Sequence, residues 1–205
     1  CTQEDDVVLL DDRMLQTPGI ALQSTVTEIV RMGNIVAETL KESKEVLFTK
    51  SEETIKSIKE KESVVDKLSA GITDYAIKIT ALQVSEKEHQ DVAHLLQVVS
   101  DMERICDYCE NISEYAEAMR DKKLEFSEIA TEEIKQMMDV CVESYLYAKE
   151  AFFEKNSEKA VKVIEKETLA DDLEVRLRNK HIKRLANNQC NAETGIFYLD
   201  TLVSM

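Results

Sequence analysis

An internal repeat constrains the fold of this 205-residue chain more than any other feature of its sequence. Residues recur at a constant offset of 105 positions through the first part of the repeat, and the register then shifts by two. The matching pairs include Glu28 and Glu133, Met32 and Met137, Phe48 and Phe153, Asp66 and Asp171, Leu68 and Leu173, and, after the shift, Leu96 and Leu199. So many identities in one register predict a duplicated structural unit.

Residues that form turns are scarce, because the chain has only four glycines and one proline. A sheet protein needs a turn about every ten residues, whereas long helices need few. Aromatic residues make up 5% of the chain, and Glu, Lys, Leu, Ile and Ala are abundant, as is typical of helical bundles. We therefore expect the repeated unit to be all-α.

Capping signals divide the chain into six long helices. The predicted helix starts are Thr17-Pro18, Ser51, Ser85, Ser127, Asn156 and Asn191. Ser85 is followed three residues later by Glu88, which is the pattern of a capping box. Long helices joined by short connections pack antiparallel. We expect two tandem antiparallel three-helix bundles, with a linker at 1–16, a first repeat at 17–122 and a second repeat at 123–205 whose last helix is incomplete.

The charge and the cysteines narrow the class of protein. Lys and Arg number 26 against 41 Asp and Glu, which gives a net charge of -15. Such a surface repels phosphate backbones and anionic lipid, so we expect neither nucleic acid nor lipid as a direct partner. The five cysteines are odd in number and scattered, which favours reduced thiols in the cytoplasm. No apolar run reaches the roughly 20 residues that span a bilayer. We expect this chain to be a soluble fragment of a longer protein.

Paired carboxylates are the strongest candidates for a binding site. In the third predicted helix, Glu103 and Asp107 are four residues apart beside an apolar stripe. Glu62 and Asp66 repeat this spacing in the second helix, and the fifth helix repeats it again. Carboxylates one turn apart can share a hard cation, and two such helices side by side would chelate a metal cluster. The competing interpretation is a solvated acidic face with intrahelical ion pairs.

Other motifs point to packing rather than to chemistry. Cys106 and Cys109 form a C-x-x-C pattern, but both lie on the apolar face, where core packing is the expected role. Glu86 and His89 form one E-x-x-H, whereas di-iron bundles need two on separate helices. His181 has no obvious partner in the sequence, so we interpret it as an ordinary helix residue.

The third predicted helix also contains the run Glu103-Arg104-Ile105-Cys106-Asp107, followed by Asn111-Ile112. This run resembles the E-R-I-G-D-x-x-x-N-I motif of the PhoU family, with Cys106 in place of the usual glycine. Residues 10–22 resemble the segment that joins the membrane part of bacterial sodium/phosphate cotransporters to a C-terminal PhoU-like domain.

The resemblance implies a non-catalytic regulatory domain that controls phosphate uptake, made of two tandem three-helix bundles. Its implied place is the cytoplasmic face of the inner membrane, with the membrane transporter domain of the same polypeptide as partner and self-association as a homo-oligomer. It also implies iron or another metal cluster on Glu103 and Asp107, with Glu62 and Asp66 as the second pair. The matching motif of the second copy would begin where the chain ends.

Two alternatives stay open at this point. One is a free-standing PhoU-type negative regulator that damps phosphate signalling through a histidine kinase and an ABC transporter. The other is a metal-dependent enzyme of the four-helix carboxylate type.

Overall fold

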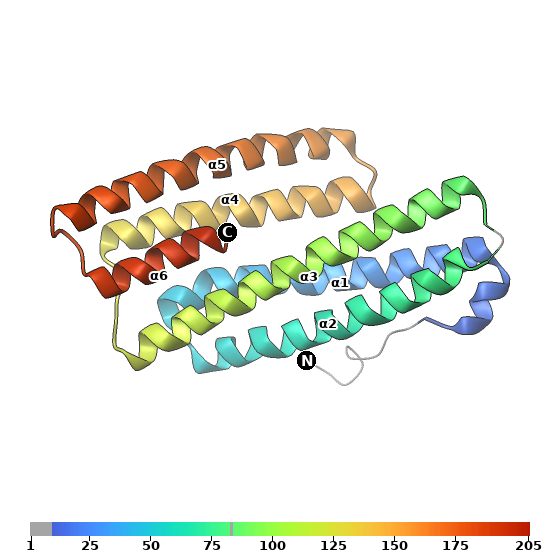
Figure 1. The fold of residues 1–205 in the computed structure, drawn as a ribbon, viewed down its shortest axis with the longest axis horizontal. Helices are drawn as coiled ribbons and strands as arrows, with labels where there is room; N and C mark the ends of the chain where they lie inside the picture. Colours follow the sequence, from blue (N-terminus) through green and yellow to red (C-terminus); the bar gives the residue numbers. More distant parts are fainter. Residues whose placement is uncertain (1–9, 83) are drawn as a thin grey trace. The chain divides into compact units, whose positions relative to one another are not determined.

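The computed structural model describes residues 10–82 and 84–205, and this part of the chain is entirely helical (Figure 1). It contains no strand, so the predicted all-α fold is confirmed. The elements are a short 3-10 helix at Asp12–Gln16, α1 at Pro18–Thr49, α2 at Glu52–Thr80, α3 at Glu86–Asp121, α4 at Glu128–Phe153, α5 at Ser157–Ala186 and α6 at Ala192–Val203. The last helix has 12 residues, against 36 for its counterpart α3. Cys1 lies outside the described residues.

The helices begin at the predicted capping residues. Ser85 and Glu88 form the expected capping box, in which the Ser85 amide donates to the Glu88 carboxylate at 2.7 Å and the Glu88 amide donates to the Ser85 hydroxyl at 3.3 Å. Ser127, Asn156 and Asn191 each accept hydrogen bonds from first-turn amides of α4, α5 and α6. These bonds satisfy amides that have no partner within the helix.

The helices end without glycine. Lys50, Lys123, Lys155 and Asn188 have φ angles between 51° and 55°, in the left-handed region that usually favours glycine. After α5, the Gln189 amide donates to the Arg184 carbonyl at 2.9 Å, as in a Schellman motif. Lys50 and Lys155 are separated by the repeat offset, so the duplication preserved the backbone conformation that ends each first helix.

The chain divides into two compact units, and the division cuts across α1, α2 and α3. Among the described residues, unit 1 comprises 10–39, 59–82 and 84–107, and unit 2 comprises 40–58 and 108–205. In unit 1, residues 12–16 of the predicted linker form the 3-10 helix instead of an open tether. The Tyr75 hydroxyl donates to the Asp11 carbonyl at 2.9 Å, and Leu10, Met14 and Leu15 pack against the core.

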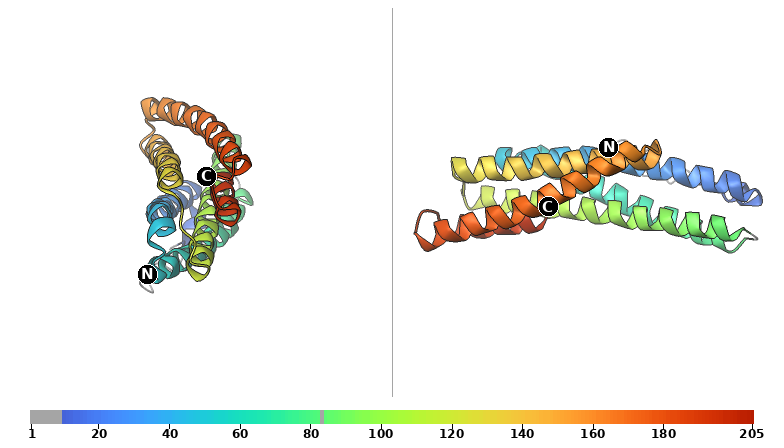
Figure 2. Two further views of the ribbon diagram at one scale, coloured as in Figure 1. Left: turned by 90° about the vertical axis from the view of Figure 1, so that its left-hand side faces the viewer. Right: turned by 90° about the horizontal axis from the view of Figure 1, so that it is seen from above.

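Unit 2 contains α4, α5 and α6, which contact one another (Figures 1 and 2). Ile134 of α4, Leu173 and Leu177 of α5, and Tyr198 of α6 are all buried. The same unit includes the turn between α1 and α2, where the Lys50 ammonium donates to the Leu124 carbonyl at 2.6 Å. This packing brings the starts of α4 and α6 and the end of α5 around one cavity.

Candidate functional site

Three of the four predicted metal-binding carboxylates lie together in unit 1. Glu62 and Asp66 of α2 and Asp107 of α3 each offer an oxygen, and these oxygens lie within 4.8 Å of one another. The helical period explains the arrangement, because residues four apart stack on one face and α3 presents Asp107 to that face. Across residues 10–82 and 84–205, no other group of three His, Cys, Asp or Glu side chains converges in this way.

Glu103, the fourth predicted residue, is not a member of that group. It lies one turn before Asp107 on α3, and the charges of Asp107 and Asp66 act on its carboxylate. Partial burial raises its pKa, and the negative charges of Asp107 and Asp66 raise it further. Burial and the charge of Asp66 likewise raise the pKa of Asp107. Negative charge is therefore crowded at this point, which is the electrostatic condition that a bound cation would relieve.

The donor set suits a hard cation. All candidate ligands are carboxylate oxygens, which Mg²⁺, Ca²⁺, Mn²⁺ and iron accept, whereas zinc structural sites use sulfur and nitrogen. Asp66 is exposed and Glu62 and Asp107 are half-buried, so an ion can reach the group from solvent. In the second repeat, Glu167 and Asp171 have the same spacing but are both exposed.

A second polar cluster, in unit 2, was not predicted from the sequence. The Glu133 carboxylate of α4 accepts hydrogen bonds from Arg184 of α5 at 3.0 and 2.6 Å and from the Tyr198 hydroxyl of α6 at 2.8 Å. Lys180 approaches the same carboxylate at 3.8 Å. Burial alone would raise the pKa of Glu133, but the bonds from Arg184 and Tyr198 outweigh burial and lower it. The cluster thus holds an ionised carboxylate inside the bundle.

The counterpart of Glu133 in the first copy has a charged partner on its own helix. Glu28, the counterpart of Glu133, is also buried, but it pairs with Arg31 one turn along the same helix at 2.7 Å. The position that matches Arg31 is Gln136, which carries no charge. The second copy therefore takes its cation from another helix. The recurrence of a buried glutamate at one repeat position was the only sequence signal for this cluster.

His181 of α5 is part of the same region and has partners that the sequence did not indicate. Its side chain is 3% exposed and stacks on Tyr198, with ring centroids 4.3 Å apart. Its Nδ1 lies 3.4 Å from an Arg184 nitrogen, and its Nε2 is buried beside the backbone of Gly195. Burial and the nearby charge of Arg184 lower the pKa of His181, so the ring is neutral.

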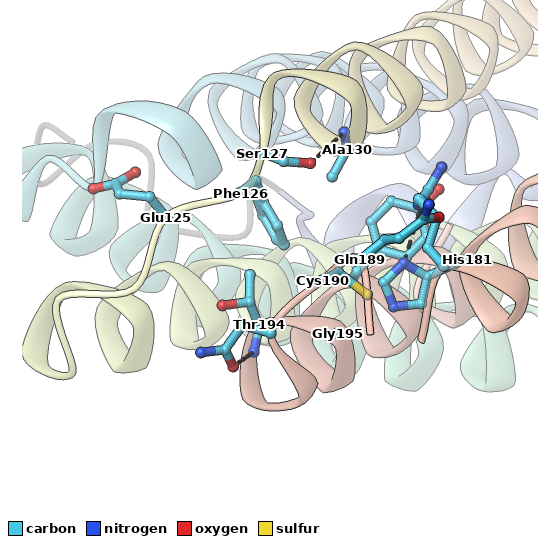
Figure 3. Close-up of a pocket in the computed structure, with 12 residues that line it drawn as sticks. Glu125, Phe126, Ser127, Ala130, His181, Gln189, Cys190, Thr194 and Gly195 are labelled. Carbon is cyan, nitrogen blue, oxygen red and sulfur yellow. Dashed lines mark hydrogen bonds between the residues drawn. The ribbon is translucent and has the colours of Figure 1, made fainter. Parts of the chain in front are cut away.

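The cavity beside this cluster has a volume of about 300 Å³ (Figure 3). It is lined by residues of α4, α5 and α6, among them Ser127, His181 and Gly195. A Cβ atom at Gly195 would lie 2.8 Å from His181 Nε2, so only glycine leaves room for the imidazole in this position. Glycine is therefore required at position 195, because the His181 ring lies too close for a side chain.

The remaining motifs behave as predicted. Cys106 and Cys109 are both buried in the core. Burial raises the pKa of Cys109 to about 12, so its thiol stays protonated. His89 is exposed in the first turn of α3, where its ring contacts the Ser85 carbonyl. Among the described helices, none has an apolar stretch long enough to cross a bilayer.

Comparisons with known proteins agree on one family. The family model described as "PhoU domain" matches residues 29–116 and 134–205, which is once in each repeat. The chain is 24% identical, over 84% of its length and 74% of the other protein, to a phosphate-specific transport system accessory protein PhoU homolog from Thermotoga maritima. It is 23% identical to a putative inorganic phosphate export protein from Salmonella typhimurium, over 96% of this chain but only 36% of that one.

A solved structure has the same fold. The crystal structure of a phosphate transport system regulatory protein from Streptococcus pneumoniae superposes with a TM-score of 0.80 at 19% identity, over 92% of this chain and 87% of that chain. Since the match covers nearly the whole chain, the all-helical bundle fold is shared.

Proposed function

The chain belongs to the PhoU family, and we propose that it is a non-catalytic accessory protein that regulates phosphate transport in trans, as a separate polypeptide. The main support for this proposal is that the PhoU family model matches the chain twice, at residues 29–116 and 134–205. The relative from T. maritima is named as an accessory protein of a phosphate-specific transport system, and this chain matches 74% of its length. A match to most of a protein with this printed role supports the proposal that the chain acts as an accessory regulator.

A second candidate rests on a different relative. The phosphate export protein of S. typhimurium matches nearly this whole chain but is much longer, so the chain would correspond to one part of it. This match supports a role for the chain as one part of a longer transport protein. Under this alternative the chain regulates a membrane domain of its own polypeptide, at the cytoplasmic face of the inner membrane.

We further infer that the acidic group in unit 1 binds a metal ion. Glu62, Asp66 and Asp107 would hold the ion, and Glu103 would supply a further charge one turn away on α3. The closeness of three carboxylate oxygens and the raised pKa values of Glu103 and Asp107 support this role. When bound, the metal would neutralise the crowded charge and link α2 to α3 within unit 1. Occupancy of the site would then favour one conformation of the regulator over another.

The experiment measures both uptake and efflux of radiolabelled phosphate in cells that lack this protein. An accessory regulator of uptake predicts that uptake no longer declines when external phosphate is high, while efflux is unchanged. Slower efflux with normal control of uptake would instead support the export-linked alternative. Normal uptake and normal efflux together would contradict both candidates.

A further inference from the structure

We propose that the outward face of α5 is a self-association surface, on which two copies of this chain pair through antiparallel α5 helices. In the described part of the chain, five of the twelve large apolar side chains that are exposed belong to this one helix. Four of them form a row that we call the outer stripe, which consists of Val161, Ile164, Val175 and Ile182 together with the smaller Thr168. The proposal does not depend on the metal site or on the proposed function.

The outer stripe lies opposite the face of α5 that is buried in unit 2. Leu173 and Leu177 are each 1% exposed, and Val175 lies two residues from both of them. At about 100° per residue, this spacing puts Val175 on the other side of the helix, where it is 54% exposed. The helices that α5 contacts, α4 and α6, lie on the same side of it (Figures 1 and 2). The outer stripe therefore faces away from the core of unit 2.

The spacing of the outer stripe suits a partner helix. Seven residues separate each neighbouring pair in the row Val161, Thr168, Val175 and Ile182. This repeat keeps one row of side chains against a second helix over several turns. The row is about 30 Å long at 1.5 Å per residue, so two helices paired along it make a narrow interface. An interface of that size belongs to the weak and transient class.

The charges beside the outer stripe favour a second copy that runs in the opposite direction. Glu165, Asp172, Arg176 and Lys183 are exposed, and their spacings of seven, four and seven residues place them along one flank. The acidic pair thus lies toward the start of α5 and the basic pair toward its end. One antiparallel register brings Glu165 opposite Lys183 of the second copy and Asp172 opposite Arg176 of the second copy. A parallel pair in register would instead place like charges together.

Most of these charges have no other partner in the part of the chain that the structure describes. Asp172, Arg176 and Lys183 form no ion pair there, and Glu165 pairs with Lys162 on its own helix at 2.9 Å. Exposed ion pairs contribute little free energy. We therefore assign the affinity to the outer stripe and the direction of pairing to the charges.

The same flank argues against a membrane as the occupant. Glu165 and Asp172 would repel anionic lipid, and on the other flank Glu167 and Asp171 are exposed as well. Helices that lie on membranes carry Lys and Arg beside large apolar side chains such as Trp, Phe and Leu. The outer stripe has only Val, Ile and Thr. A second copy of this chain matches both the apolar row and the mixed charges.

The test measures the oligomeric state of the 205-residue protein by sedimentation equilibrium, from micromolar to millimolar concentration. We expect the average mass to rise from the monomer value toward the dimer value. Val175→Glu should weaken dimerisation at least about tenfold, because it buries a carboxylate in the seam. The matched control is Ile77→Glu, which changes a similarly exposed side chain of α2 and should dimerise like the parent protein. A monomer at every concentration, or equal dimerisation of Val175→Glu and the parent protein, would overturn the proposal.

Charge reversal tests the antiparallel register. Arg176→Glu alone should weaken dimerisation by up to about tenfold, because the repulsion with Asp172 occurs twice in a symmetric dimer. The double variant Asp172→Arg, Arg176→Glu exchanges the two signs and should recover the affinity of the parent protein. A double variant that stays as weak as Arg176→Glu would overturn the antiparallel pairing.

Vesicles of phosphatidylglycerol provide the remaining arm of the experiment. We expect the parent protein to stay in solution when these vesicles are sedimented. Binding of the parent protein to the vesicles, together with loss of that binding in Val175→Glu, would assign the outer stripe to lipid and overturn self-association through it.

Discussion

Arg184 holds the Glu133 carboxylate with two nitrogens, Nη1 at 3.0 Å from Oε1 and Nη2 at 2.6 Å from Oε2. Both side chains are largely buried, at 10% exposure for Glu133 and 17% for Arg184. Such a fork geometry fixes the relative rotation of α4 and α5. The Tyr198 hydroxyl extends the same contact to α6, so one carboxylate joins all three helices of the second repeat.

Replacing Glu133 with Gln should therefore destabilise the protein by about 3 kcal/mol, because Arg184 would remain buried without its counterion. Urea denaturation monitored by circular dichroism measures this change. The control is Glu193→Gln, which breaks an exposed pair with Lys122 and should cost less than about 1 kcal/mol. Equal losses of unfolding free energy in the two variants would show that the buried pair stabilises the protein no more than the exposed pair does.

Acidification should remove the stability that the ionised Glu133 carboxylate contributes. The pKa of Glu133 is lowered in the folded protein below its ordinary value of 4.5, so the unfolded chain binds the proton more tightly. Stability from this group is present above pH 4.5 and is lost as the pH falls through the folded pKa. The difference in unfolding free energy between the parent protein and Glu133→Gln should consequently shrink on acidification. A difference that is constant from neutral to acidic pH would contradict this.

The acidic group of unit 1 should respond in the opposite direction. Because the pKa values of Glu103 and Asp107 are raised, these carboxylates oppose folding at neutral pH in metal-free protein, and the penalty vanishes as the pH falls. Asp107→Asn should then stabilise metal-free protein, by less than about 1 kcal/mol. Thermal melts in the presence of a chelator measure this gain.

The double variant Asp66→Asn, Asp107→Asn should lose bound metal, as measured by mass spectrometry of the elements after loading with Mn²⁺ or Fe²⁺. For the parent protein, metal at 100 times its dissociation constant should add about 2.7 kcal/mol of stability. The matched control is Glu167→Gln, Asp171→Asn, which has the same spacing in the exposed second copy. Unchanged metal content in the Asp66 and Asp107 double variant would contradict the proposed metal site.

The left-handed lysines give a prediction about stability alone. Lys155→Gly should stabilise the protein by about 1 kcal/mol, because glycine adopts the observed φ of 52° without strain. Lys50→Gly should gain less, since it also loses the bond to the Leu124 carbonyl and the ion pair with Glu125. Denaturation midpoints of the two variants decide the matter, and a larger gain for Lys50→Gly would refute the explanation.

The two polar sites show which features a sequence alone can predict. Capping by Ser85 depends on residues within one turn, and the spacing of Glu62 and Asp66 depends on the helical period, so both could be inferred. The contact between Glu133 and Arg184 joins residues 51 positions apart. No local pattern encodes that pairing, and it appears only once α4 and α5 are packed. The stacking of His181 of α5 on Tyr198 of α6 could not be inferred for the same reason.

We propose that this chain regulates phosphate transport as a separate polypeptide. The test uses bacterial cells that lack their own PhoU-family accessory protein and express the 205-residue chain in its place. The quantity measured is the initial rate of phosphate uptake at high external phosphate. If the proposal is right, the chain restores the low uptake rate of the parent cells. An uptake rate that stays as high as in the deletion cells, with the chain folded and present, would contradict it.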